Sequence, residues 1–223
     1  MSLTPLELAA VTVAAAVVGA ALGWWPLAAW MRRDLLTETI WPARGPGIRL
    51  GFALATGALW ALIAWRISST TALIVLVPLL AFAAAAVVLA VVDLAEKRLP
   101  NAVIVPALIS IAILLVLTSA VTGLWWNLLW ALAGSAGMFG LYLLIALIPG
   151  AMGMGDVKLA ALIGLTLGWF GLSVWLVGLF AGCLIGGVAA IVALVLRAVR
   201  FKGTVPYGPS MLAGALVALL VLV

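Results

Sequence analysis

The chain has no histidine and only one cysteine, Cys183. Without histidine, it has neither a histidine-activated serine or cysteine nucleophile nor a histidine-ligated metal. A single cysteine also excludes a cysteine zinc site and an internal disulfide bond. We therefore expect no metal site. Of the usual catalytic groups, the acids remain, and the 223 residues include only six Asp and Glu.

Charge of either sign is scarce. Charged residues make up 8% of the chain and hydrophobic residues 68%, with a mean hydropathy of +1.43. A water-facing surface needs far more charge, so this composition excludes a soluble globule and predicts a polytopic membrane protein. The net charge of +5 comes from eleven basic residues in short loops. That placement is explained by membrane topology, and no nucleic-acid partner is expected.

Eight apolar runs approach the length of about 20 residues that a helix needs to cross a bilayer. The sequence therefore predicts an all-α protein with about eight transmembrane helices in one domain, residues 1–223. The predicted spans are 6–31, 50–65, 71–92, 101–117, 124–148, 157–169, 171–196 and 208–223. The longest polar stretch, 32–49, is too short to form a domain of its own and is expected to be a cytoplasmic loop.

The distribution of Arg and Lys predicts an orientation. Alternating spans place ten of the eleven basic residues on one side of the membrane and Arg66 on the other. Basic loops are retained in the cytoplasm, so both termini are expected outside. The same topology places two acids together on the cytoplasmic side, Asp93 at the end of the third run and Asp156 at the start of the sixth.

Asp93 and Asp156 are the main functional candidates. A carboxylate at bilayer depth costs about 2.5 to 3.5 kcal/mol on insertion scales, so an acid there suggests a function. Two such acids at one depth can form an aspartic dyad, in which one deprotonates a water and the other protonates the scissile carbonyl. Helix dipoles favour Asp156, at a helix start, as the base and Asp93, at a helix end, as the proton carrier. Alternatively, both are ordinary charges at span boundaries, Asp93 near Lys97 and Asp156 near Lys158.

Gly153 and Gly155 frame Asp156. They remove side-chain bulk just before the acid, which is expected to let the backbone turn into a helix and a substrate strand lie close. Other glycines recur at four-residue spacing, which is typical of closely packed membrane helices. These are Gly19, Gly23, Gly178, Gly182 and Gly186.

Taken together, the motifs resemble those of the type IV prepilin peptidases, membrane aspartic proteases of the GxGD type. Asp93 with the downstream Leu-Pro-Asn at 99–101 is similar to the family's first catalytic aspartate. GMGDVKLAALIGLTLG at 153–168 is similar to the segment that carries the second. Pro-Tyr-Gly-Pro at 206–209 is similar to a Pro-Phe-Gly-Pro string that members carry before the last span.

This resemblance implies an endopeptidase that removes the basic leader from prepilin or pseudopilin precursors, with Asp93 and Asp156 as the catalytic pair. It further implies a multi-pass protein of the bacterial cytoplasmic (inner) membrane, embedded in the lipid bilayer and active at the cytoplasmic face in type IV pilus assembly or protein secretion. Residues expected to bind substrate or shape the site are Gly153, Gly155, Lys158, Pro100, Asn101, Pro206 and Tyr207. Acids suited to a basic leader are Asp34, Glu38 and Glu96.

The chain departs from the family in the loop after the first span. Many bacterial members insert a domain with two CxxC pairs there, and they also methylate the new N-terminus with S-adenosylmethionine. Here the eighteen residues 32–49 contain no cysteine and are too few to enclose a ligand of that size. Leader cleavage is therefore expected without any cofactor, and S-adenosylmethionine is needed only if methylation occurs.

The main alternative is a proton- or cation-coupled membrane transporter that uses the same acids. It would need acids deep within its spans, whereas both candidates lie at span ends. A structural platform of a secretion machine is a third interpretation. Proton flux in proteoliposomes would identify the transporter, and pilus assembly with both aspartates neutralised would identify the platform.

Overall fold

The computed structural model describes residues 4–27, 46–68, 73–149, 152–196 and 206–223, and every regular element within them is helical. The α-helices within these described ranges are α1 (Pro5–Leu22), α3 (Pro46–Ser68), α4 (Leu76–Glu96), α5 (Asn101–Thr122), α6 (Trp125–Ala146), α7 (Met154–Gly168), α8 (Leu172–Val195) and α9 (Gly208–Leu222). A π-helical turn, Gly23–Leu27, prolongs α1, and a 3-10 turn, Leu73–Val75, precedes α4. The predicted all-α class is confirmed.

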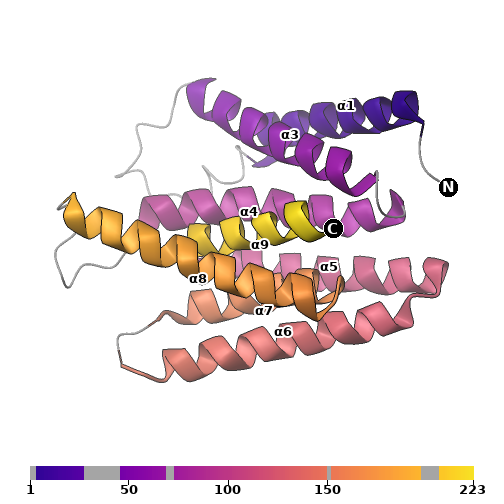
Figure 1. Ribbon diagram of the computed structural model, residues 1–223. Helices are drawn as coiled ribbons and strands as arrows, with labels where there is room; N and C mark the ends of the chain where they lie inside the picture. The colour runs from indigo at the N-terminus through magenta and orange to yellow at the C-terminus, as the bar shows by residue number, and fades with distance from the viewer. Residues whose placement is uncertain (1–3, 28–45, 69–72, 150–151, 197–205) are drawn as a thin grey trace.

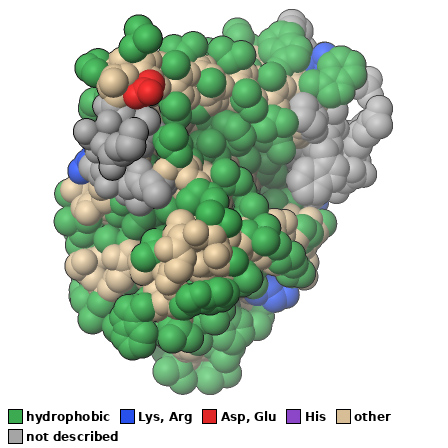
Figure 2. All heavy atoms as spheres, turned by 90° about the vertical axis from the view of Figure 1, so that its right-hand side faces the viewer, with side chains coloured by type: hydrophobic (Ala, Val, Ile, Leu, Met, Phe, Trp, Pro, Cys, Tyr) green, Lys and Arg blue, Asp and Glu red, His purple; other side chains and the backbone are tan. Residues whose placement is uncertain are grey.

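Successive helices run in opposite directions, so the bundle has two ends (Figure 1). The end of α4 and the starts of α5, α7 and α9 lie at one of them, which we call the aspartate end. The start of α1 and the C-terminus lie toward the other. Figure 2 looks onto that opposite end, where hydrophobic side chains dominate and few charged ones interrupt them. Which membrane side each end faces stays a prediction.

Six of these helical segments are long and apolar enough to cross a membrane: Pro5–Trp25, Arg49–Ile67, Leu73–Glu96, Asn101–Thr122, Trp125–Ala146 and Leu172–Val195. The other two predicted spans correspond to α7 and α9, which have 15 residues each. Helix α7 is enclosed by its neighbours, with Val157 and all residues from Leu159 to Gly168 buried. A helix surrounded by protein need not match the thickness of the hydrocarbon. Helix α7 can therefore be shorter than a span that faces lipid.

Some predicted boundaries shift. Helix α1 ends at Leu22, and residues 28–31 of the first predicted span lie outside the described residues. Helix α3 begins at Pro46 rather than at residue 50, which suits proline in a first helical turn. Helix α4 continues beyond residue 92 to Glu96 and ends at Lys97, whose φ of 51° is left-handed. Asp93 therefore lies inside the last turn of α4 rather than beyond it.

Glycines bring several helix pairs into backbone contact. Between α6 and α7, a Cβ on Gly134 would lie 2.6 Å from the carbonyl oxygen of Gly164, and one on Gly164 would overlap the Gly134 carbonyl. Between α8 and α9, a Cβ on Gly182 would lie 3.3 Å from the Cα of Met211. Small residues thus permit the close approach that their spacing predicted for α8.

Substitution of Gly164 by Ala should destabilise the bundle. The added methyl group would overlap the Gly134 carbonyl, and overpacking of this kind costs about 1 to 3 kcal/mol. The matched control is Gly140→Ala on α6, where a Cβ meets no heavy atom within 4 Å. The free energy of unfolding, measured in bicelles, should fall for Gly164→Ala only. Equal stability of the two variants would contradict the close α6–α7 packing.

Candidate active site

Helices α4, α7 and α9 converge on the carboxyl group of Asp93. This side chain lies on α4 and is only 5% exposed. Its Oδ2 accepts a hydrogen bond of 3.0 Å from the backbone N–H of Gly208, the first residue of α9. A Cβ on Gly208 would lie 2.8 Å from that oxygen and 3.4 Å from Cδ2 of Leu159 on α7. Glycine is therefore required at position 208 for this approach.

Asp156 lies in the first turn of α7, ahead of its buried stretch and outside the six long spans. The helix begins after Gly153, whose extended backbone lets its carbonyl accept a hydrogen bond of 3.1 Å from the Asp156 N–H. Partial burial raises the pKa of Asp156 to about 6, the negative charge of Asp93 adds to the rise, and a backbone hydrogen bond from Gly153 opposes it. The structure thus brings the two predicted acids within electrostatic reach of each other.

The helix dipoles that act on the two acids match the sequence-based expectation for Asp156 but not fully for Asp93. Asp156 lies at the N-terminal end of α7, as expected. Asp93 lies near the C-terminal end of α4 but also faces the N-terminal end of α9, whose dipole favours a negative charge. The dipoles of α4 and α9 therefore oppose one another at Asp93, and the helix ends alone do not assign Asp93 as the proton carrier. Which acid is the base stays a prediction.

The Leu-Pro-Asn segment lies against the start of α7. The Lys158 Nζ donates a hydrogen bond of 2.9 Å to Oδ1 of Asn101, the first residue of α5. Pro100 is the N-cap residue of α5 and holds an extended conformation. Four predicted site residues, Pro100, Asn101, Gly155 and Lys158, thus lie at one junction. Because Lys158 donates a hydrogen bond to Asn101, its side chain links α7 to α5. This position favours a structural role over contact with a leader.

Gly155 has a different neighbour from the one expected. Its missing side chain was expected to leave room for a substrate strand, but a Cβ there would lie 2.9 Å from Cβ of Leu99. The space beside Gly155 is therefore filled by the protein itself. Gly153 is less restricted, since a Cβ would lie 3.6 Å from Oδ2 of Asp156, an ordinary contact. Gly155 is needed for packing beside the acid.

The only two tyrosines of the chain meet near the aspartate end. Tyr142 of α6 is 2% exposed, and its ring centroid lies 6.5 Å from that of Tyr207, which precedes α9. The Tyr207 hydroxyl donates a long hydrogen bond of 3.5 Å to Sγ of Cys183 on α8. Pro206, the other predicted residue of this loop, is half-buried. The sequence did not single out Tyr142, and its only signal was the rarity of tyrosine.

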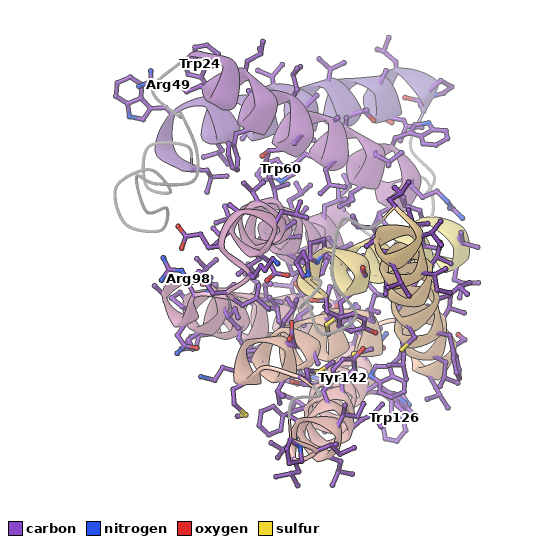
Figure 3. The ribbon with its side chains drawn as sticks, turned by 90° about the vertical axis from the view of Figure 1, so that its left-hand side faces the viewer. Trp24, Arg49, Trp60, Arg98, Trp126 and Tyr142 are labelled. Carbon is purple, nitrogen blue, oxygen red and sulfur yellow. The ribbon has the colours of Figure 1, made fainter. Side chains whose placement is uncertain are left out.

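Basic side chains of the described residues gather at the same end. Arg49 lies in the first turn of α3, and Lys97 and Arg98 directly follow α4. Figure 1 places both of these helix ends at the aspartate end, which Figure 3 views end-on. Arg66 lies near the opposite end, where its Nε donates a hydrogen bond of 3.0 Å to the carbonyl of Leu220. This distribution agrees with the predicted alternation of basic loops.

Of the three acids suited to a leader, only Glu96 is described. It forms an ion pair with Arg98, and its side chain is 6% exposed, so it is poorly placed to receive a further cation. Asp34 and Glu38 lie outside the described residues, as do all of residues 32–45 from the predicted cytoplasmic loop.

Comparison with known proteins gives one match. A family model described as the type IV leader peptidase family matches residues 80–191, half of the chain, and this range includes both Asp93 and Asp156. Searches of curated proteins and of solved structures found no match.

Proposed function

Because the chain belongs to the type IV leader peptidase family and is thus a multi-pass membrane protease, we propose that it is an aspartic endopeptidase with Asp93 and Asp156 as its dyad. One observation supports this most strongly. Acids from two helices far apart in sequence lie at one end of the bundle, where the charge of Asp93 contributes to the raised pKa of Asp156 and Asp93 accepts a backbone hydrogen bond. Histidine is absent, so acid and base catalysis falls to these carboxyl groups.

In the proposed reaction, the two acids exchange a proton through water and substrate. One carboxylate removes a proton from a water as the water oxygen attacks the scissile carbonyl carbon, while the other carboxyl group protonates the carbonyl oxygen. The tetrahedral intermediate then breaks its C–N bond. The proton on the first acid passes to the leaving nitrogen, and a hydroxyl group of the intermediate returns a proton to the second acid as the new carboxyl C=O forms. The pair ends with one proton, as it began, and titrates as a unit.

The proposed substrates are prepilin or pseudopilin precursors with a basic leader, cut at the cytoplasmic face of the bacterial inner membrane. The described cationic side chains Arg49, Lys97 and Arg98 at the aspartate end support the cytoplasmic placement, since basic loops are retained there. Asp34 and Glu38 are the proposed leader contacts, because Glu96 is already paired with Arg98.

The transporter alternative is less favoured. A proton or cation relay would require acids near the middle of membrane helices. Both Asp93 and Asp156 lie in terminal turns, one at the end of α4 and one at the start of α7. The family match also supports proteolysis.

The proposed activity is tested by incubating purified enzyme with a prepilin precursor and determining the mass of the mature N-terminus. We expect cleavage that a metal chelator does not change, and a free amino terminus even when S-adenosylmethionine is supplied. The physical reason is the short segment 32–49, which contains no cysteine and therefore cannot form a zinc-stapled domain. Absence of cleavage would contradict the protease, whereas a methyl group that appears only with S-adenosylmethionine would contradict the cofactor-free product.

A further inference from the structure

We propose that the ring of Tyr207, held between Tyr142 and a notch at Gly186, is a positioning group that keeps the Gly208 N–H directed at Oδ2 of Asp93. This inference rests on the proposed function, because it explains how one acid of the dyad is fixed in a single orientation. It assigns a role to Tyr142 of α6 and Gly186 of α8, neither of which belongs to the two catalytic motifs in the sequence.

The Tyr207 ring is held from two sides. On one side, it lies against the backbone of α8 at the buried Gly186, where a Cβ would overlap Cε2 of the ring and lie 3.0 Å from Cδ2. On the other, it faces the buried Tyr142 ring at an interplanar angle of 39°. The hydroxyl meets Sγ of Cys183, three residues before Gly186 on the same helix. Helices α6 and α8 together thus fix the ring.

The fixed ring also fixes the first turn of α9. Tyr207 is the N-cap residue, and its carbonyl accepts hydrogen bonds from the N–H groups of Ser210 at 3.1 Å and Met211 at 3.2 Å. The next peptide N–H belongs to Gly208 and points at Asp93. One peptide unit therefore joins the clamped residue to the donor, so a shift of the ring would move the donor with it.

The hydrogen bond makes the two oxygens of Asp93 inequivalent. Oδ2 accepts from Gly208, which disfavours a proton on that oxygen, so Oδ1 is the favoured oxygen for proton exchange. Without the clamp, the buried carboxyl group could rotate and present either oxygen. Misplacement of a catalytic group by about 1 Å can cost about 100-fold in rate. Because the clamp acts through Asp93, its loss should lower kcat and leave KM nearly unchanged.

The test uses two adjacent glycines of α8. Gly186→Ala places a methyl group into the Tyr207 ring, whereas Gly187→Ala adds the same group where no heavy atom lies within 4 Å. With a fluorogenic leader peptide, we expect Gly186→Ala to lower kcat about 10- to 100-fold with KM within about twofold, and Gly187→Ala to keep both values. Equal kcat values for the two variants would overturn the proposal.

A double-mutant cycle separates the clamp from general destabilisation. Tyr207→Ala should lower kcat as Gly186→Ala does. The double variant should be no slower than Tyr207→Ala alone, since both changes remove the same contact between the Tyr207 ring and α8. Tyr207→Phe, which keeps the ring, should restore most of the kcat that Tyr207→Ala loses. Additive losses in the double variant, or no restoration by Phe, would contradict a role of the ring.

Hydrogen exchange at the Gly208 amide tests the geometry without any substrate. Measured by NMR on the whole protein in bicelles, exchange should be slow in wild type and Gly187→Ala and at least about tenfold faster in Gly186→Ala, because an open hydrogen bond leaves the amide unprotected. Unchanged exchange in Gly186→Ala would overturn the positioning proposal even if the enzyme is active. Failure of wild type to cleave any precursor, with the exchange pattern as expected, would instead refute the proposed function and leave the clamp established.

Discussion

Replacing either Asp93 or Asp156 with Asn is expected to lower leader cleavage about 100- to 10,000-fold, because each change removes a group that must gain or lose a proton. Asn has nearly the same volume as Asp, so neither change should create a cavity. Both variants should still insert in the membrane in normal amounts. Cleavage is measured by the mass of the mature product from co-expressed prepilin, and insertion by the enzyme content of the membrane fraction.

The matched control is Glu7→Gln. It neutralises another carboxylate but lies in the capping box at the start of α1, at the opposite end of the bundle. Its loss should cost about 1 kcal/mol of helix stability at most and leave cleavage unchanged. Normal processing by either Asp variant, with the enzyme present in the membrane, would remove the dyad from the mechanism.

Gly155→Val is expected to reduce cleavage to a similar extent while both acids remain. Even the first carbon of the new side chain would lie 2.9 Å from Cβ of Leu99, and valine adds two methyl groups beyond it. Either α7 or the Leu-Pro-Asn segment must then move. Because Asp156 follows Gly155 directly, that movement displaces the acid from Asp93. Initial rates with a fluorogenic leader peptide measure the effect.

Gly140→Val on α6 is the control for adding a β-branched residue to a helix. A Cβ at this position meets no heavy atom within 4 Å, and valine has no poorer helix propensity than glycine, so the variant should keep its activity. Wild-type turnover by Gly155→Val would show that Leu99 moves aside for the valine while Asp156 keeps its position, and would contradict the prediction.

The class of the fold could be predicted from the sequence, and the two acids could be selected as candidates, because both steps depend on scarcity. Few charges predict helices in lipid, and among six acids only Asp93 and Asp156 interrupt or adjoin long apolar runs next to recognisable motifs. Helix ends were less predictable. Hydropathy reports which residues suit lipid, whereas a helix continues as long as its backbone hydrogen bonds do, and α4 accordingly continues to Glu96.

The surroundings of the acids could not be predicted, because they depend on how the helices pack. The donor to Asp93 is a backbone N–H, which leaves no side-chain signature in the sequence. Tyr142 reaches Tyr207 only because α6 places it toward the aspartate end, and one tyrosine in an apolar helix gives no sign of that. The sequence predicts room for a substrate strand beside the glycine before Asp156, whereas Leu99 as the neighbour of that glycine follows from the fold alone.

The paired action of Asp93 and Asp156 is tested most directly by comparing three variants, Asp93→Asn, Asp156→Asn and the double variant, in one assay of kcat with a leader peptide. Residues that act as a unit show strongly non-additive losses. We predict that all three variants fall to the same residual rate, because the loss of either acid already removes the shared-proton pair. A double variant whose loss equals the product of the two single losses would contradict the pair.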